Sequence, residues 1–141
     1  MKYYQDGQKY IVVLKKGEDL MEGLGQFCKG AGVSEAWLQG LGAALSVELG
    51  YYHLDEQEYK WRKFDGPLEI TGLNGNIVQK DGQPVFHIHA SLSGPDYGAI
   101  GGHVKSLTVA GTCEMLVHKT DTKLTRTHDE QVGLDLLSPA S

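Results

Sequence analysis

The sequence predicts an α+β domain, mostly antiparallel β-sheet with one principal helix packed on a face. The prediction rests on one amphipathic stretch early in the chain, alternating apolar and polar residues through most of the remaining chain, and 19 glycines among 141 residues. That glycine content lies well above the usual ~7% and has no fixed period, which is typical of strands that bend, bulge or approach another backbone. No linker interrupts the pattern, so residues 1–141 are expected to form a single domain with its core at about 10–118.

The first strand and the helix are expected near the beginning of the chain. A β-branched run at 10–14, followed by two lysines and a glycine, predicts a buried strand. From 18 to 30, apolar residues recur at the spacing of one helical face; they are Leu20, Leu24, Phe27 and Ala31. Acidic residues crowd the first turn, where the helix dipole favours anions. Lys29 and Gly30 are typical of a helix end.

The remainder of the chain alternates as strands do. Strands are expected at 36–41, 45–53, 59–64, 68–78, 85–93 and 106–118, with a short last one at 123–127. A glycine-containing bend at Gly42 separates the first two of these. Asp81-Gly82 predicts a hairpin turn between two later ones. The tail from about 129 onward is weakly patterned and is predicted to be partly mobile.

The composition excludes several classes of protein. Eighteen acids against thirteen bases give a formal charge of −5, which argues against a basic surface for nucleic acid. No apolar run approaches the ~20 residues that span a bilayer, and the first residues do not resemble a secretory leader, so no membrane partner is expected. Cys28 and Cys113 cannot make a disulfide framework, so a reducing, cytoplasmic location is predicted.

Three of the six histidines form a pattern that is typical of a metal site. His87 and His89 lie two apart on a predicted strand, so their side chains share one face with Cα atoms ~6.5–7 Å apart. His103 follows a loop at 93–102 that is long enough to return the chain to the neighbouring strand. Three neutral imidazoles suit zinc best among the common metals, with iron, cobalt and nickel as other candidates. Such a site leaves a coordination position open for water or a small-molecule ligand.

The other histidines and the strand carboxylates show no comparable pattern. They are His53, His118, His128, Glu69 and Glu114. Each is expected to be an ordinary solvated or hydrogen-bonded residue, although His118 and the two glutamates are placed where they could approach the histidine face. Neither cysteine belongs to a Cys-x-x-Cys pair, so neither is predicted to be a ligand or nucleophile. Trp37 and Trp61 are expected in the core or at a subunit contact.

Three segments of the chain resemble the PPC domain, the "plants and prokaryotes conserved" family. They are Leu-Glu-Ile-Thr-Gly-Leu-Asn-Gly-Asn-Ile at 68–77, Phe-His-Ile-His-Ala-Ser-Leu at 86–92, and Gly101-Gly102-His103-Val104 with Leu107. The order of elements also fits, and the resemblance runs from about residue 10 to 118. It implies an α+β fold assembled as a homotrimer, with a metal held by His87, His89 and His103. Plant members of the family are nuclear proteins that carry AT-hooks.

Three functions of different kinds remain open. The first is a trimeric metal-binding protein, with zinc as the expected metal and a regulatory or ligand-sensing role. The second is a metal-dependent enzyme acting on a small molecule, for which no general base is evident. The third is DNA binding, the role commonly ascribed to prokaryotic members by extension from the plant proteins. This chain has no Arg-Gly-Arg-Pro core, and its closest approach to a basic cluster is Lys60-Trp61-Arg62-Lys63, so DNA is a doubtful partner.

Overall fold

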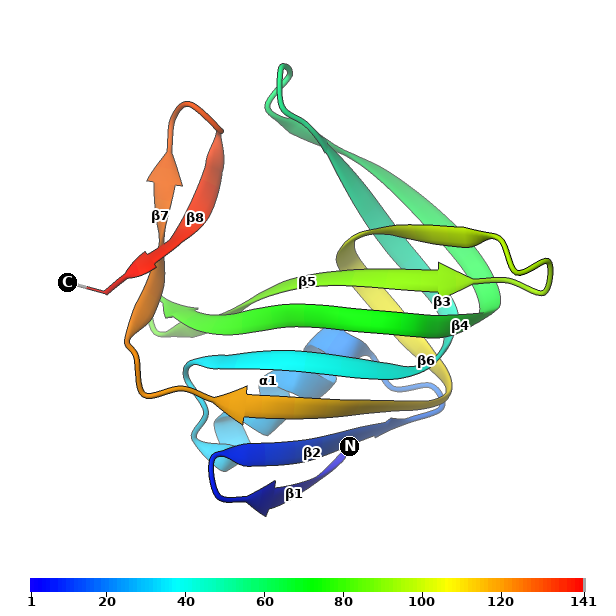
Figure 1. The fold of residues 1–141 in the computed structure, drawn as a ribbon, viewed down its shortest axis with the longest axis horizontal. Helices are drawn as coiled ribbons and strands as arrows, with labels where there is room; N and C mark the ends of the chain where they lie inside the picture. The colour runs from blue at the N-terminus through cyan, green and yellow to red at the C-terminus, as the bar shows by residue number, and fades with distance from the viewer. Residues whose placement is uncertain (141) are drawn as a thin grey trace.

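Eight strands and one helix make up residues 1–140, the part of the chain that the computed structural model describes (Figure 1). In chain order they are β1 Lys2–Asp6, β2 Lys9–Lys15, α1 Leu20–Ala31, β3 Ala36–His53, β4 Glu58–Lys80, β5 Gln83–Ser93, β6 Ala99–Lys119, β7 Leu124–Asp129 and β8 Leu134–Pro139. All of the strand pairs are antiparallel, which confirms the predicted α+β architecture. Among these residues, no helix is long and apolar enough to cross a membrane.

Six strands form one sheet in the order β1-β2-β6-β3-β4-β5, and β5 pairs with β6 as well. Strands β3, β4, β5 and β6 therefore close into a hydrogen-bonded ring, here called the strand ring. Strand β6 is long enough to serve two neighbours, because residues 99–103 pair with β5 whereas residues 112–118 pair with β2. In Figure 1, β6 runs between β3 on one side and the β1–β2 pair on the other.

A glycine bulge lets β3 bend without breaking. The pairing register of β3 shifts on both sides of Gly42, against β4 and against β6. Gly42 has φ of +153°, and a Cβ atom there would lie 2.1 Å from the carbonyl oxygen of Thr112. Only glycine fits this close approach. The prediction of two strands separated at Gly42 is therefore wrong, since the strand runs unbroken through a bulge.

Helix α1 covers one face of the sheet and contacts β2, β5 and β6. The side chain of Asp19 caps its first turn by accepting two backbone hydrogen bonds of 2.8 and 3.0 Å, and Gly32 ends it in the left-handed conformation with φ of 63°. The apolar face predicted from the sequence is fully buried at Leu20, Leu24 and Phe27. The helix predicted at 18–30 is thus confirmed with a small shift of its ends.

The sequence prediction missed a strand at each end of the chain. Strand β1 is exposed along its whole length, and β8 is mostly exposed or half-buried, so neither shows the alternation of a strand with one buried face. Strand β8 pairs with β7 in a separate two-stranded hairpin, here called the tail hairpin, which contacts β4. Residues 134–139, in the stretch predicted to be a weakly patterned tail, therefore form a strand that the sequence pattern did not indicate.

Candidate metal centre

The three predicted histidines lie side by side on β5 and β6. His89 is the direct cross-strand partner of His103, and His87 lies two residues before it on the same face. Ring nitrogens of the three side chains lie within 4.8 Å of one another, and the Nε2 atoms of His87 and His89 are 3.2 Å apart. Within residues 1–140, this histidine triad is the one group of three or more His, Cys, Asp or Glu side chains that is placed to hold a metal ion.

The alternation of β5 and a pair of glycines on β6 create this arrangement. Ile88, Ala90 and Leu92 are buried in the core, which turns the intervening histidines outward. On β6, a Cβ at Gly101 would lie 3.0 Å from the Ala90 carbonyl oxygen, and one at Gly102 would lie 2.8 Å from the Gly50 carbonyl oxygen. The glycine pair therefore lets β6 approach its neighbours closely just before His103.

Burial keeps two of the three imidazoles neutral. Burial lowers the pKa of His103 to about 4, and the neighbouring histidines and Arg126 add to the effect. Burial also lowers the pKa of His87, with smaller contributions from Arg126 and His89. The Nδ1 atom of His103 is buried without a hydrogen-bond partner in the described chain. Metal ions bind neutral imidazoles, so this donor set fits a transition metal.

Aromatic residues of β4 form one wall beside the triad. The Tyr59 ring centroid lies 5.0 Å from that of His103, and Trp61 stacks on Tyr59 at 4.7 Å with an interplanar angle of 24°. Trp61 is 39% exposed and lies 6.0 Å from His103, so it is not a core residue. Trp37 is 52% exposed on the sheet face opposite α1 and is not in the core either.

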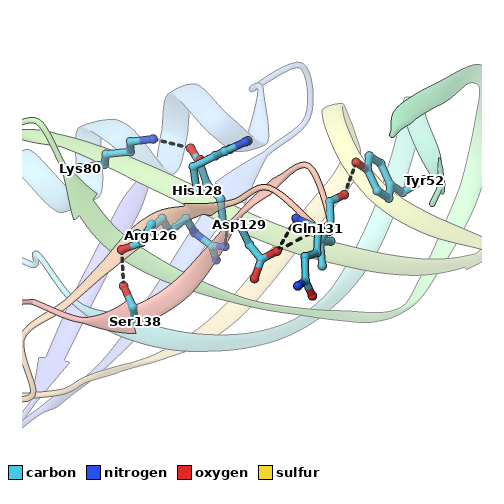
Figure 2. A network of polar contacts seen from close by, with 10 residues as sticks. Tyr52, Lys80, Arg126, His128, Asp129, Gln131 and Ser138 are labelled. Carbon is cyan, nitrogen blue, oxygen red and sulfur yellow. Dashed lines mark hydrogen bonds and ion pairs between the residues drawn. The ribbon is translucent and has the colours of Figure 1, made fainter. Parts of the chain in front are cut away.

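The tail hairpin brings a positive charge to the triad, which no motif in the sequence indicates. Arg126 of β7 donates from Nη2 to Asn76 Oδ1 at 2.7 Å and from Nη1 to the Asp135 carbonyl oxygen at 3.0 Å. Asn76 is the cross-strand partner of His87, so Arg126 is fixed next to the triad. Figure 2 shows Arg126 and His128 on the hairpin, with Lys80 extending toward it from β4.

The other candidate residues lie away from the triad, with one exception. His118 pairs with Trp37, three strands away from His87. Glu69 and Glu114 belong to other parts of the sheet and are not in the cluster. His128 is the exception, because it lines a cavity shared with the triad. Both cysteines are buried, and burial raises the pKa of each thiol to about 11, in keeping with their predicted inert role.

Together the fold and the triad define a small antiparallel β protein with a three-histidine centre on two paired strands of the strand ring. The chain belongs to the Plants and Prokaryotes Conserved (PCC) domain family, also abbreviated PPC, whose model matches residues 1–121. The resemblance seen in the sequence is thereby confirmed. The tail hairpin begins after the end of this match.

Solved structures share the fold over nearly the whole chain. A metal-containing protein from Archaeoglobus fulgidus is 35% identical with a TM-score of 0.86, covering 94% of each chain. A plant- and prokaryote-conserved (PPC) protein from Pyrococcus horikoshii is 28% identical with a TM-score of 0.86, covering 99% of this chain and 96% of that one. A "putative DNA-binding protein" from Bacteroides thetaiotaomicron is 28% identical with a TM-score of 0.92, covering 97% and 96%. The comparison with curated proteins finds no match.

Proposed function

We propose that the chain binds one transition-metal ion through His87, His89 and His103, with zinc as the expected metal. The convergence of three ring nitrogens within 4.8 Å carries this proposal. Three imidazoles suit zinc and leave its fourth position open. The name of the Archaeoglobus relative as a metal-containing protein supports a metal in this chain as well.

The residues around the triad favour holding a ligand over transferring a proton. A bound metal would supply Lewis acidity toward an oxygen ligand at the open position. The chain itself keeps His87 and His103 neutral and shields one side of the triad with Tyr59. Asp135 is the one acid that lines the adjoining cavity among the described residues, and it already pairs with Lys80. A ligand-sensing or regulatory role therefore has more support than hydrolysis.

Metal content tests this proposal directly. We expect about one zinc per chain, by elemental analysis, after purification or reconstitution. His89→Ala should abolish binding, whereas His118→Ala should keep it, because His118 is an exposed histidine three strands away. Cobalt substitution should give the visible spectrum of a tetrahedral site. If neither the purified nor the reconstituted protein holds metal, the proposal is wrong.

The proposal includes assembly into a homotrimer, as the family resemblance implies. The sheet face opposite α1, here called the open face, carries the exposed apolar side chains Ile11, Trp37 and Leu41, which are 46, 52 and 58% exposed. Hollows of about 500 and 420 Å³ lie between them on this face. Contiguous exposed apolar patches mark association sites, and two further copies of this chain are the proposed occupants. Light scattering should give three times 15.4 kDa, and Trp37→Glu should reduce it, whereas a monomeric mass for the parent protein would refute assembly.

DNA binding is the second candidate, favoured by the name of the Bacteroides relative. The basic cluster at 60–63 gives it little support, because Lys60 pairs with two glutamates, Lys63 lies 3.6 Å from Asp65, and Arg62 lies over the Phe64 ring. Fluorescence anisotropy at near-physiological salt should show no sub-micromolar binding to duplex DNA. Tight binding that falls steeply with salt and is lost on changing Arg62 and Lys63 to glutamate would favour the DNA-binding function.

A further inference from the structure

The geometry points to an anion-binding pocket beside the histidine triad, and we propose that it takes a small organic acid whose carboxylate pairs with Arg126. The inference deepens the proposed metal function, since the same ligand would place a second oxygen at the open position of the metal. The pairing with Arg126 does not itself require the metal, so the two proposals can fail separately.

The pocket is a cavity of about 480 Å³ between the triad and the tail hairpin. Cavities of roughly 300–1,000 Å³ are the usual size of small-molecule sites. Its wall contains Tyr59, Lys80, Val85, Phe86, His87, His103, Arg126, His128, Gly133, Leu134, Asp135 and Leu136. Strands β4, β5 and β6 provide one side and the hairpin provides the other, so a ligand in the cavity lies against both the triad and Arg126.

Arg126 is held in place by neutral oxygens. Its two hydrogen-bond acceptors are the side-chain amide of Asn76 and a backbone carbonyl, neither of which carries charge. Its Nε atom is buried and has no hydrogen-bond partner in the described chain. Burial lowers the pKa of Arg126, and the nearby Asp135 carboxylate, whose side-chain oxygens are not hydrogen-bonded to the guanidinium, offsets only part of this effect. An arginine stays protonated under these conditions, so its charge remains to be balanced.

The charges around the cavity leave one cation without a counter-ion. Lys80 forms an ion pair with Asp135, whose other oxygen lies 3.3 Å from His128 Nδ1. Asp135 is the single acid in the lining among the residues described, so the guanidinium of Arg126 is in excess. A divalent metal at the triad would increase that excess. A desolvated cation of this kind favours a carboxylate, whose two oxygens match the planar N–H donors of arginine.

The apolar part of the lining indicates the rest of the ligand. Val85, Phe86, Leu134 and Leu136 share the cavity with the Tyr59 ring, and such walls suit a short carbon skeleton rather than a sugar or a nucleotide. A small organic acid with a second oxygen donor combines the required features. One end pairs with Arg126, and the other reaches toward the triad.

Malonate is a suitable probe because it has two carboxylates on one carbon. Calorimetric titration of the zinc-loaded protein should show malonate binding, and the uncharged analogue malonamide should not bind. Arg126→Gln should weaken malonate binding about tenfold or more, the usual loss for a charge-assisted hydrogen bond, with unchanged zinc content. Arg62→Gln is the matched control, since Arg62 is the other arginine of the chain, is exposed and does not line the cavity. Inorganic phosphate, titrated in parallel, should bind more weakly than malonate.

A measurement on the unaltered protein guards against a variant that fails to fold. The chain has two arginines, Arg62 and Arg126, so its NMR spectrum has two arginine Nε–H signals. Addition of malonate should shift the Arg126 signal and leave the Arg62 signal in place. If the Arg126 signal does not move, or if Arg126→Gln binds malonate as well as the parent protein, the pocket is not the anion site. Tighter binding of phosphate than malonate would overturn the assignment to a carboxylic acid.

Metal analysis and the NMR titration with malonate together separate the metal proposal from the anion-pocket proposal. If the protein takes up no metal, the metal function fails, whereas the shift of the Arg126 signal in metal-free protein still decides the anion site. If metal binds but the Arg126 signal is unaffected by malonate, the metal function stands and the anion pocket is refuted.

Discussion

Two regions of the molecule differ in how their buried polar groups are hydrogen-bonded. One is the core beneath α1, and the other is the histidine end, which consists of the histidine triad and the tail hairpin beside it. Beneath α1, the buried side chains are aliphatic, aromatic or sulfur-containing, with the thiols of Cys28 and Cys113 among them, and both ends of the helix are capped. At the histidine end, His103 Nδ1 and Arg126 Nε are buried without hydrogen-bond partners in the described chain, and the third such atom is Thr120 Oγ1, beside the loop that follows α1. Each such group costs about 1–3 kcal/mol of folding free energy. The contrast indicates that the α1 side stabilises the fold while the histidine end is arranged for partners from outside the chain.

The largest effect on stability is expected when a substitution creates a cavity under the helix. Phe27 is fully buried and packs edge-to-face on Tyr10 with ring centroids 5.2 Å apart. Phe27→Ala should lower the free energy of unfolding by about 3–5 kcal/mol, measured by urea denaturation. Phe64→Ala is the control, because that ring is only half-buried and should lose less. The zinc stoichiometry of folded Phe27→Ala should not change. If Phe27→Ala lowers the free energy of unfolding by less than about 1 kcal/mol, the core beneath α1 does not have the stabilising role given to it here.

The next effect concerns the bulge that joins the two regions. Gly42→Ala would force a Cβ against the Thr112 carbonyl oxygen in a backbone conformation that alanine rarely adopts, and should cost about 2–3 kcal/mol. Gly25→Ala in α1 is the control, because its Cβ would meet nothing within 4 Å and helix propensity should add about 0.5–1 kcal/mol. Equal thermal shifts for the two variants would show that the bulge does not require glycine.

The features that were predictable from sequence depend on short-range periodicity. The helix was predictable because Leu20, Leu24 and Phe27 repeat at helical spacing and all three are buried. The outward position of His87 and His89 was predictable because strand side chains alternate. The position of His103 required only that β6 return beside β5, which a loop of that length allows.

The features that were missed depend on contacts between distant parts of the chain. Arg126 meets Asn76 across 50 residues of sequence, and nothing near either residue in the chain signals this pairing. Trp61 could belong to a core by its chemistry, and only the course of β4 places it beside His103. The bulge at Gly42 cannot be told from a break by sequence, because a glycine in a strand pattern is compatible with both.

A pH titration of metal-free protein tests the histidine end. His103 is faced by His87, His89 and Arg126, and its pKa is about 4 in the folded chain against an ordinary value of 6.5. Between these values the unfolded chain binds more protons, so the free energy of unfolding should fall by about 1–2 kcal/mol as the pH is lowered from 6.5 to 4. Asparagine does not titrate in this range. Between pH 6.5 and 4, the free energy of unfolding of the parent protein should therefore fall by this much more than that of His103→Asn. Parallel pH profiles for the two proteins would contradict the prediction.

The smallest effects come from two aspartates that make the same contact in different regions. Asp19 accepts two backbone hydrogen bonds at the start of α1, and Asp129 accepts two of 2.9 and 3.0 Å at the turn of the tail hairpin. The hairpin turn is also held by the Tyr52 hydroxyl, which donates to the Val132 carbonyl oxygen at 2.7 Å (Figure 2). Both carboxylates accept two backbone hydrogen bonds of the same kind. A difference in effect between replacing Asp19 and replacing Asp129 by alanine therefore reflects the regions in which they lie.

Asp19→Ala should lower the free energy of unfolding by about 1 kcal/mol, the usual value of a helix cap, and leave malonate affinity unchanged. Asp129→Ala should have less effect on global unfolding, because the tail hairpin is a separate two-stranded sheet whose opening leaves the strand ring intact. It should weaken malonate binding, since it loosens the element that carries Arg126. Urea denaturation measures the free energy of unfolding of each variant, and malonate titration measures its malonate affinity. If Asp129→Ala lowers global stability as much as Asp19→Ala and leaves malonate binding unchanged, the hairpin belongs to the stabilising core and not to the binding site.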